Sequence, residues 1–397
     1  MNIAPLLMEA ERYLVEKDVD RAAALFTHAQ EQCGGRSPWP LLGLGRIALL
    51  MQKFDDARQL FDAVITLFPK CAEAFTLRGL IEEQAERLDE AARFHAQALS
   101  LDPALALAHF NQGRTFALRE QWDLAAASFQ LALQHGATNV ELKVQLGTAL
   151  FRAKRSSDAL KVLALTVQSH PKHLDAILTL ADVLVETGSL ELAVELLDNA
   201  KPRLPDVPLI ASRRAAIALR QKDLEAARTE AWRHAELAPK DEEAWLFAAV
   251  IDTMQLRFDS AEKALKKVLR LNPKSWRAHY HLGGLYDAVK DKAAAKQSYR
   301  EAIACDGAAW EPLNNLATML LEEGTQAAVE EARRLLDRAA RVGTRGDAVL
   351  VRYNLALACF KLGDLAGARR AAQELLKLAP PDHPMATEAQ RVLKVAA

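Results

Sequence analysis

Small and apolar residues recur at a fixed interval along this chain, with short polar segments between them. A step of 34 residues connects eight alanines in an unbroken series: Ala57, Ala91, Ala125, Ala159, Ala193, Ala227, Ala261 and Ala295. Twelve residues before each alanine stands another small residue: Gly45, Gly79, Gly113, Gly147, Ala181, Ala215, Ala249 and Gly283. Self-similarity at a period of this length is typical of repeat architectures. The chain is therefore predicted to be one continuous array of repeats.

Each period predicts two antiparallel helices joined by a polar turn. In Gly45 to Ala57 (GRIALLMQKFDDA) the two small residues fall on facing helices, where small side chains permit close approach. Prolines that cannot donate within a helix mark helix ends at Pro69, Pro103, Pro171, Pro205, Pro239 and Pro273. Two residues before the marker alanines stand carboxylates, which the helix dipole favours in a first turn: Asp20, Asp55, Asp89, Asp123, Glu191, Glu225, Asp259 and Glu330.

One segment carries a specific resemblance. Trp276 to Asp306 reads WRAHYHLGGLYDAVKDKAAAKQSYREAIACD, with Leu282-Gly283, Tyr286, Ala295 and Tyr299 at the offsets of the tetratricopeptide repeat (TPR) family. The chain resembles a TPR protein over nearly its whole length. That resemblance implies an all-α fold, an α-solenoid that coils as a right-handed superhelix of helix-turn-helix repeats.

The register assigns eleven repeats and one capping helix. The repeats are 3–36, 38–71, 72–105, 106–139, 140–173, 174–207, 208–241, 242–275, 276–309, 310–346 and 349–382, and the capping helix is 383–397. Asp382 is expected at the N-cap of that last helix, with Met385, Ala389, Val392 and Leu393 on one face. Two places look irregular. Lys201 to Pro208 holds three prolines that shorten a helix, and Glu323 to Val329 is a short insertion in a turn.

Composition and charge exclude several classes of protein. The 397 residues carry a formal net charge of −1, so no global basic field attracts nucleic acid or anionic membrane. Met1 to Ala10 lacks the basic start of a signal peptide, and no apolar run reaches the length of a membrane span. The four cysteines, Cys33, Cys71, Cys305 and Cys359, form no Cys-x-x-Cys pair. We expect a cytoplasmic protein that does not insert into a membrane.

No constellation of residues predicts catalysis, a cofactor or a metal. Gly43 and Gly45 mimic part of a dinucleotide fingerprint, but they lie in a helix and not after a strand. His279 and His281 point roughly 200° apart on a helix, too far apart to chelate one ion. His170 and His173 flank an inter-repeat turn, with no carboxylate or cysteine expected beside them to complete a metal site. We expect no enzyme, no cofactor and no metal.

What the family implies about binding concerns the first helices of the repeats, which line a concave groove in TPR proteins. The candidate groove residues are Arg46, Phe110, Asn111, Arg114, Phe151, Arg213, Arg220, Tyr280, His281, Asn314, Asn315, Tyr353 and Asn354. Asn111, Asn315 and Asn354 occupy the offset at which superhelical members bind a peptide backbone, and Arg46, Asn111 and Arg114 together suit a carboxylate. The lysine and asparagine pattern with which other members clamp chaperone tails is absent.

The leading hypothesis is therefore a non-catalytic scaffold that binds a segment of a protein partner in the concave groove. One alternative is an accessory or assembly factor of a bacterial membrane or secretion complex that acts through a partner. A second is RNA binding by Arg257 to Glu301, which holds eleven basic and five acidic residues, including Lys263, Lys266, Lys267 and Arg270. Leu174 to Val207 is the opposite, with seven acidic and two basic residues, which suits protein partners better.

Overall fold

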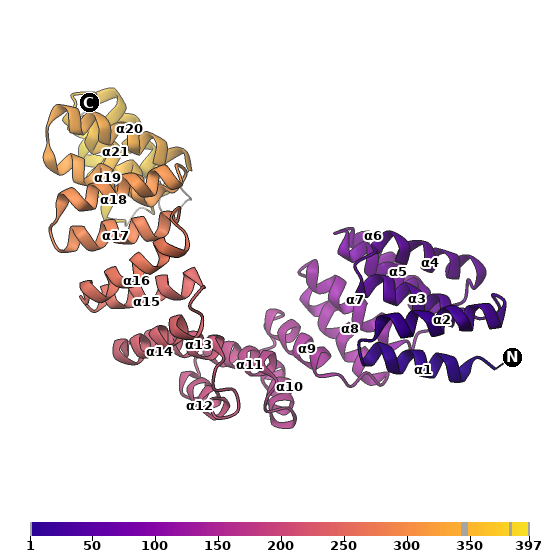
Figure 1. The fold of residues 1–397 in the computed structure, drawn as a ribbon. Helices are drawn as coiled ribbons and strands as arrows, with labels where there is room; N and C mark the ends of the chain where they lie inside the picture. Colours follow the sequence, from indigo (N-terminus) through magenta and orange to yellow (C-terminus); the bar gives the residue numbers. More distant parts are fainter. Residues whose placement is uncertain (1, 343–347, 381–382, 396–397) are drawn as a thin grey trace. The chain divides into compact units, whose positions relative to one another are not determined.

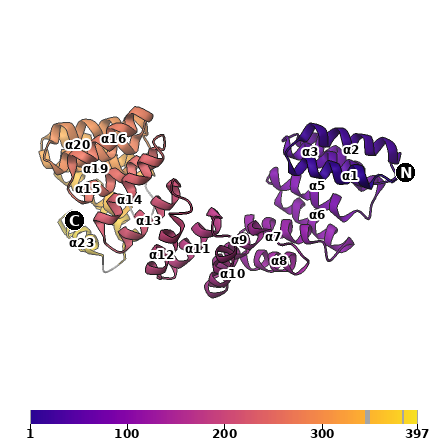
Figure 2. The same cartoon turned by 60° about the horizontal axis from the view of Figure 1, so that its bottom comes forward.

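The computed structural model describes residues 2–342, 348–380 and 383–395, and within them the chain forms helices and no strand (Figures 1 and 2). The helices are α1 (Ala4–Val15), α2 (Val19–Cys33), α3 (Trp39–Leu50), α4 (Phe54–Leu67), α5 (Ala72–Gln84), α6 (Leu88–Leu101), α7 (Ala106–Leu118), α8 (Trp122–Gln134), α9 (Val140–Arg152), α10 (Ser156–Ser169), α11 (Leu174–Glu186), α12 (Leu190–Ala200), α13 (Pro208–Arg220), α14 (Leu224–Leu237), α15 (Glu242–Met254), α16 (Phe258–Leu271), α17 (Trp276–Ala288), α18 (Lys292–Cys305), α19 (Trp310–Glu323), α20 (Gln326–Val342), α21 (Ala348–Lys361), α22 (Leu365–Leu378) and α23 (Pro384–Val395). Consecutive helices pack in pairs, from α1 with α2 to α21 with α22. This is the expected α-solenoid, while the boundaries assigned to its eleven repeats stay a prediction.

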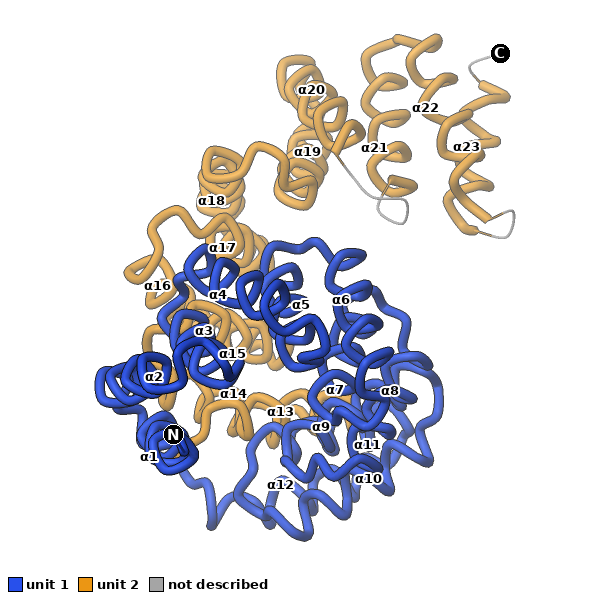
Figure 3. The backbone as a smooth tube through the Cα atoms, turned by 90° about the vertical axis from the view of Figure 1, so that its right-hand side faces the viewer, with its two compact units in different colours: residues 1–205 blue, residues 206–397 orange. Residues whose placement is uncertain are grey.

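The chain divides into two compact units, residues 1–205 and residues 206–397, coloured separately in Figure 3. The division falls within the proline-rich segment Lys201 to Pro208. This segment directly follows α12, which is the shortest of the described helices. Within the first unit, Figure 3 shows the helices following a curved path, with α5, α7 and α9 nearer its inside than α6, α8 and α10. The first helices of the pairs therefore form the inner surface of this unit.

A glycine on each of several first helices makes room for a large side chain on the second helix. A Cβ atom added at Gly113 would lie 2.7 Å from Cδ1 of Phe129, and one added at Gly45 would collide with the Phe61 ring. The same pairing, sixteen residues apart, joins Gly79 to His95, Gly147 to Leu163 and Gly283 to Tyr299. The small residues that define the period thus face a bulky side chain four residues beyond the marker alanine, and this contact closes the helix pair.

The turn inside each pair contains a residue with left-handed backbone geometry. These residues repeat with the same 34-residue step: Gln52, Glu86, Glu120, Lys154, Gly188, Lys222, Leu256, Lys290 and Gly324. Gly188 and Gly324 adopt this region without the steric penalty that a Cβ atom incurs there. Leu256 is the one apolar side chain in the series, and it is exposed. The turn geometry is therefore retained at some energetic cost in most repeats.

The carboxylates expected in the first turns of second helices lie there, except for Glu330. Asp20, Asp55 and Asp259 are examples of the first group. Glu330 is one turn further in, because α20 begins at Gln326. The predicted insertion Glu323 to Val329 is therefore largely helical and not a loop. Gly324 ends α19 in the left-handed region, and the Thr325 hydroxyl accepts the Ala328 N–H, which starts α20 early.

The last helix, α23, packs its apolar face on the preceding pair. Ala389 is buried with Val349, Ala372 and Leu375, and Met385, Val392 and Leu393 pack around them. Its N-cap, predicted at Asp382, lies outside the described residues. The apolar face expected of a capping helix is therefore present.

One buried position in the first unit holds a titratable side chain. His95 stands where Phe61 and Phe129 stand in the neighbouring repeats, and its side chain is fully buried. Neither ring nitrogen has a hydrogen-bond partner among the described residues. Burial, helped by the charge of Arg114, lowers the pKa of His95 to about 4. The imidazole is therefore neutral in the folded chain at neutral pH, and its nitrogens are an uncompensated cost.

Exchanging the residues at two left-handed turns should change stability in opposite directions. Leu256→Gly removes the strain of a Cβ atom at φ 58° and should stabilise the second unit by about 0.5 kcal/mol, after the entropy cost of glycine. Gly188→Ala places a Cβ atom at φ 81°, with no atom nearby to clash, and should destabilise the first unit by about 1 kcal/mol. Urea unfolding of each variant measures both, and equal signs would refute the strain argument.

Replacing His95 by Phe should stabilise the first unit by about 1 kcal/mol at pH 7, because it removes two unpartnered polar atoms. The reverse change in the next repeat, Phe129→His, is the matched control and should destabilise. As the pH falls from 6.5 to 4, the unfolded chain takes up a proton that the buried imidazole resists, so the wild type should lose about 3 kcal/mol. Urea unfolding at pH 7 and pH 4.5 should show a smaller acid loss in His95→Phe, and an equal loss would contradict this.

Candidate functional site

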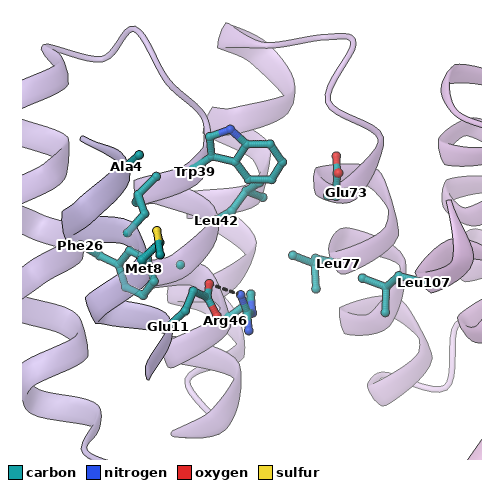
Figure 4. A pocket seen from close by; sticks show the side chains of 12 residues that line it. Ala4, Met8, Glu11, Phe26, Trp39, Leu42, Arg46, Glu73, Leu77 and Leu107 are labelled. Atoms are coloured by element: carbon teal, nitrogen blue, oxygen red, sulfur yellow. Dashed lines mark hydrogen bonds and ion pairs between the residues drawn. The ribbon is translucent and has the colours of Figure 1, made fainter. Parts of the chain in front are cut away.

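The first unit contains a large apolar groove, which we call the N-terminal groove. Its volume is about 690 Å³ (Figure 4). Its apolar lining comes from α1, α2, α3, α5 and α7, through Ala4, Leu7, Met8, Phe26, Trp39, Leu42, Gly43, Leu77 and Leu107. Trp39 is 49% exposed and Leu107 is 40% exposed, so large apolar side chains meet solvent here. A groove of this size and polarity suits apolar side chains of a ligand.

The residues that line this groove repeat in register. Trp39, Glu73 and Leu107 are 34 residues apart and occupy the second position of three consecutive assigned repeats. That position was not among the candidate site residues, although the period itself points to it. The groove therefore runs across successive first helices, and one line of side chains follows its length.

The polar residues of the groove are one ion pair and one carboxylate. Arg46 Nη1 lies 2.6 Å from Glu11 Oε1, which joins α3 to α1 (Figure 4). Glu73 begins the first turn of α5 and forms no ion pair with a described residue. The Cys71 thiol donates to its Oε2 atom over 3.7 Å. The groove thus contains the Arg46–Glu11 ion pair, whose charges cancel, and the Glu73 carboxylate, whose negative charge is available to a ligand.

Arg114 is ion-paired within the fold and Asn111 is buried, so neither side chain is presented to a ligand. Arg114 Nη2 lies 2.6 Å from Oε1 of Glu83, whose other oxygen accepts from the Thr115 hydroxyl. Since Arg46 is also paired, a ligand carboxylate would have to displace Glu11 or Glu83, so the joint carboxylate site predicted for Arg46, Asn111 and Arg114 is not preformed. Asn111 is 1% exposed, and its Nδ2 atom has no hydrogen-bond partner among the described residues.

The other predicted residues of the first helices are distributed over both units. Phe110 is half-buried against Phe129, with ring centroids 5.9 Å apart, and Phe151 is also half-buried. In the second unit, Arg213 is half-buried and Arg220 is exposed. Apart from Arg46, none of the predicted residues lines the N-terminal groove.

In the second unit the predicted residues contact one another. Tyr280 packs on His281 and Tyr299, at centroid distances of 5.2 Å and 6.0 Å, and Asn315 donates to the Tyr299 hydroxyl over 3.4 Å. Burial raises the pKa of Tyr280 and of Tyr299, the latter to about 12, and lowers the pKa of His281. These side chains form a neutral, largely buried cluster.

Most of the asparagines predicted to bind a peptide instead form hydrogen bonds within the fold. Asn354 Nδ2 donates to Asn314 Oδ1 over 2.9 Å and to the Thr318 hydroxyl over 3.4 Å. Both asparagines are buried, and Tyr353, next to Asn354, is half-buried. Amides engaged in this way connect α19 to α21, so they are not presented to a peptide in this conformation.

One expectation about metal ligands was wrong. Glu141 and Asp175 do lie beside His173, with one donor atom of each of the three residues within 4.8 Å of the others. The carboxylates come from the first turns of α9 and α11, which the sequence places one period apart. The His173 Nδ1 atom, however, accepts the Ala176 N–H as a helix cap over 3.3 Å, which uses its lone pair.

The basic residues of α16 are partly engaged. Lys266 Nζ lies 2.9 Å from Glu262 Oε1, and Lys267 Nζ lies 5.9 Å from the centre of the Trp245 ring. Lys263 and Arg270 lie on the same helix beside an open depression. No helix of the described residues is both long and apolar enough to cross a membrane.

Comparison with protein families identifies the repeat. Family models described as tetratricopeptide repeat match residues 42–106, 157–217, 255–309 and 318–383, more than half of the chain. The chain belongs to the tetratricopeptide repeat family. The resemblance found in the sequence is thereby confirmed, as is the all-α solenoid fold.

Individual relatives are more distant. The chain is 26% identical over 261 residues to a Drosophila melanogaster protein named BBSome complex member BBS4 homolog, covering 62% of this chain and 51% of that one. It thus spans about half the length of that relative. The yeast Tom70 structure aligns with a TM-score of 0.51 at 14% identity, over 99% of this chain and 95% of that one, which shows a shared fold. YrrB, described as a TPR protein with an unusual peptide-binding site, aligns at 20% identity over 55% of this chain and 95% of that one, with a TM-score of only 0.34.

Removing Arg114 should destabilise the first unit through Glu83. Arg114→Met leaves an almost fully buried carboxylate without its cation and should cost about 3 kcal/mol at pH 7. Burial raises the pKa of Glu83 already, so the loss should be smaller at pH 5, where that carboxyl can take up a proton. Urea unfolding at both pH values tests this. Glu83→Gln added to Arg114→Met should restore part of the stability, and no restoration would contradict the assignment.

Proposed function

We propose that this chain is a non-catalytic scaffold whose N-terminal groove binds an apolar segment of a protein partner. The observation that carries the proposal is a groove of about 690 Å³ with exposed Trp39 and Leu107 in its wall. Exposed apolar surface that is concave and bordered by charged residues is typical of peptide and protein binding sites.

The family and the fold support this role. TPR repeats bury their core between neighbouring helices, which leaves the inner helix surfaces available to a partner. The name of the fly relative makes that protein a member of a complex, which fits an adaptor within an assembly. Cys33, Cys71, Cys305 and Cys359 are all unpaired, which fits a reducing compartment such as the cytoplasm.

The alternatives that the sequence left open have weaker support. An assembly factor that acts through a partner would use the same groove, so the proposal includes its binding step. RNA binding would rest on Arg257 to Glu301, where Lys266 and Lys267 on α16 already have partners within the chain. The groove therefore has the stronger case.

Peptides selected from a displayed random library on the intact chain should lose affinity when the groove is altered. Leu107→Glu places a carboxylate in the apolar wall and should weaken binding at least about tenfold, because that charge would be buried under the ligand. The matched control is Leu124→Glu on α8 of the same repeat, where the side chain is 50% exposed outside the groove.

Fluorescence polarisation with the selected peptides measures both variants, and circular dichroism checks that both stay helical. Equal affinity of the wild type and Leu107→Glu would place the binding surface elsewhere. Equal weakening by Leu107→Glu and Leu124→Glu would equally count against the groove.

A further inference from the structure

The line of side chains that enters the N-terminal groove continues past it and becomes acidic. From Trp39, Glu73 and Leu107, two further steps of 34 residues reach Glu141 and Asp175, in the first turns of α9 and α11. Both carboxylates are exposed, and all five positions belong to the first unit. We call Glu73, Glu141 and Asp175 the acidic track.

The acidic track has no internal counter-charge. Glu141 accepts a hydrogen bond from Gln145 over 2.7 Å, and no ion pair joins Glu73, Glu141 or Asp175 to any residue that the structure describes. The same position behaves differently in the second unit, where Glu243 pairs with Arg277, the residue one period later, at 2.5 Å. The carboxylate at this position is therefore paired with an arginine in the second unit, whereas in the first unit it has no cationic partner among the described residues.

The geometry keeps the track negative and compact. First-turn positions place each carboxylate near the positive end of its helix dipole, which favours the ionised form. Donor atoms of Glu141, His173 and Asp175 lie within 4.8 Å of one another, so two long basic side chains of a ligand can converge there, one on each carboxylate. Two converging carboxylates without a cation repel each other, and a basic ligand side chain would relieve that repulsion.

We propose that the partner segment held by this unit is extended and has basic side chains beside its apolar anchor. This inference rests on the proposed function of the N-terminal groove and names the chemistry of its ligand. The apolar side chains occupy the space between Trp39 and Leu107, and lysine or arginine side chains lie over Glu141 and Asp175.

The spacing of such a ligand follows from the helices. Packed helices lie roughly 8 to 10 Å apart. An extended segment in polyproline II geometry advances about 3.1 Å per residue and places every third side chain on the same face. One step from α7 to α9, or from α9 to α11, thus corresponds to about three residues. The first basic residue is expected about three residues from the apolar residue at Leu107, and the second about three residues further.

Two synthetic peptides with the same apolar residues test this, one with lysines and one with glutamates at those two positions. The wild-type chain should bind the lysine peptide about tenfold more tightly, as expected for two ion pairs that each contribute about 0.7 kcal/mol. The preference should shrink between 50 mM and 500 mM salt, because exposed ion pairs are screened.

Reversing the charges of the two carboxylates on the chain is the decisive experiment. Glu141→Lys/Asp175→Lys should reverse the preference in favour of the glutamate peptide. The control is Glu191→Lys/Glu195→Lys on α12, which makes the same charge change at two exposed carboxylates, one of them also in a first turn, and should keep the wild-type preference. Circular dichroism verifies the fold of each variant.

The outcomes separate this inference from the proposed function. If both peptides bind the wild type equally while Leu107→Glu abolishes binding, the groove stands and the acidic track has no role. If neither peptide binds and Leu107→Glu has no effect on any selected peptide, the proposed function itself fails. If the lysine preference appears only in EDTA and is lost when zinc is added, the cluster is a metal site and the inference is overturned.

Discussion

The contact between a small residue on the first helix and a bulky side chain sixteen positions later determines the geometry of this chain. Where Phe129 fills the space above Gly113, no additional carbon atom fits, so the two helices approach at one distance and in one register. Because the contact recurs with the period, the pairs repeat the same geometry along each unit. The first helices then present equivalent positions side by side, and function depends on what those positions carry.

The N-terminal groove is a consequence of that repetition. The second position of five successive repeats holds Trp39, Glu73, Leu107, Glu141 and Asp175, so one line of side chains in the solenoid combines apolar and acidic residues. Repeats of this kind share their core and differ on their inner surface. The binding chemistry of the first unit therefore lies in a few variable positions on an invariant frame.

The period predicted the fold, since small residues, turns and first-turn carboxylates all report the same helix pair. It also predicted that Arg46 belongs to the inner surface, but not that Glu11 neutralises it, because that contact joins residues from different repeats. Asn111 and Asn354 show the same difficulty: their offset suggested exposed ligands, while packing of neighbouring helices buries both. The Glu141 and Asp175 contact with His173 was missed because a turn brings the end of one repeat beside the next.

Site-specific photo-crosslinking in cells tests most directly whether the inner surface of the first unit binds the partner. A benzophenone amino acid replaces Trp39 on α3 in one variant and Phe54 on α4 of the same repeat in the other, where the side chain is also exposed. We expect a discrete crosslinked protein from position 39 and none from position 54. The same crosslinked protein from position 54 alone, or from both positions in equal yield, would contradict this expectation.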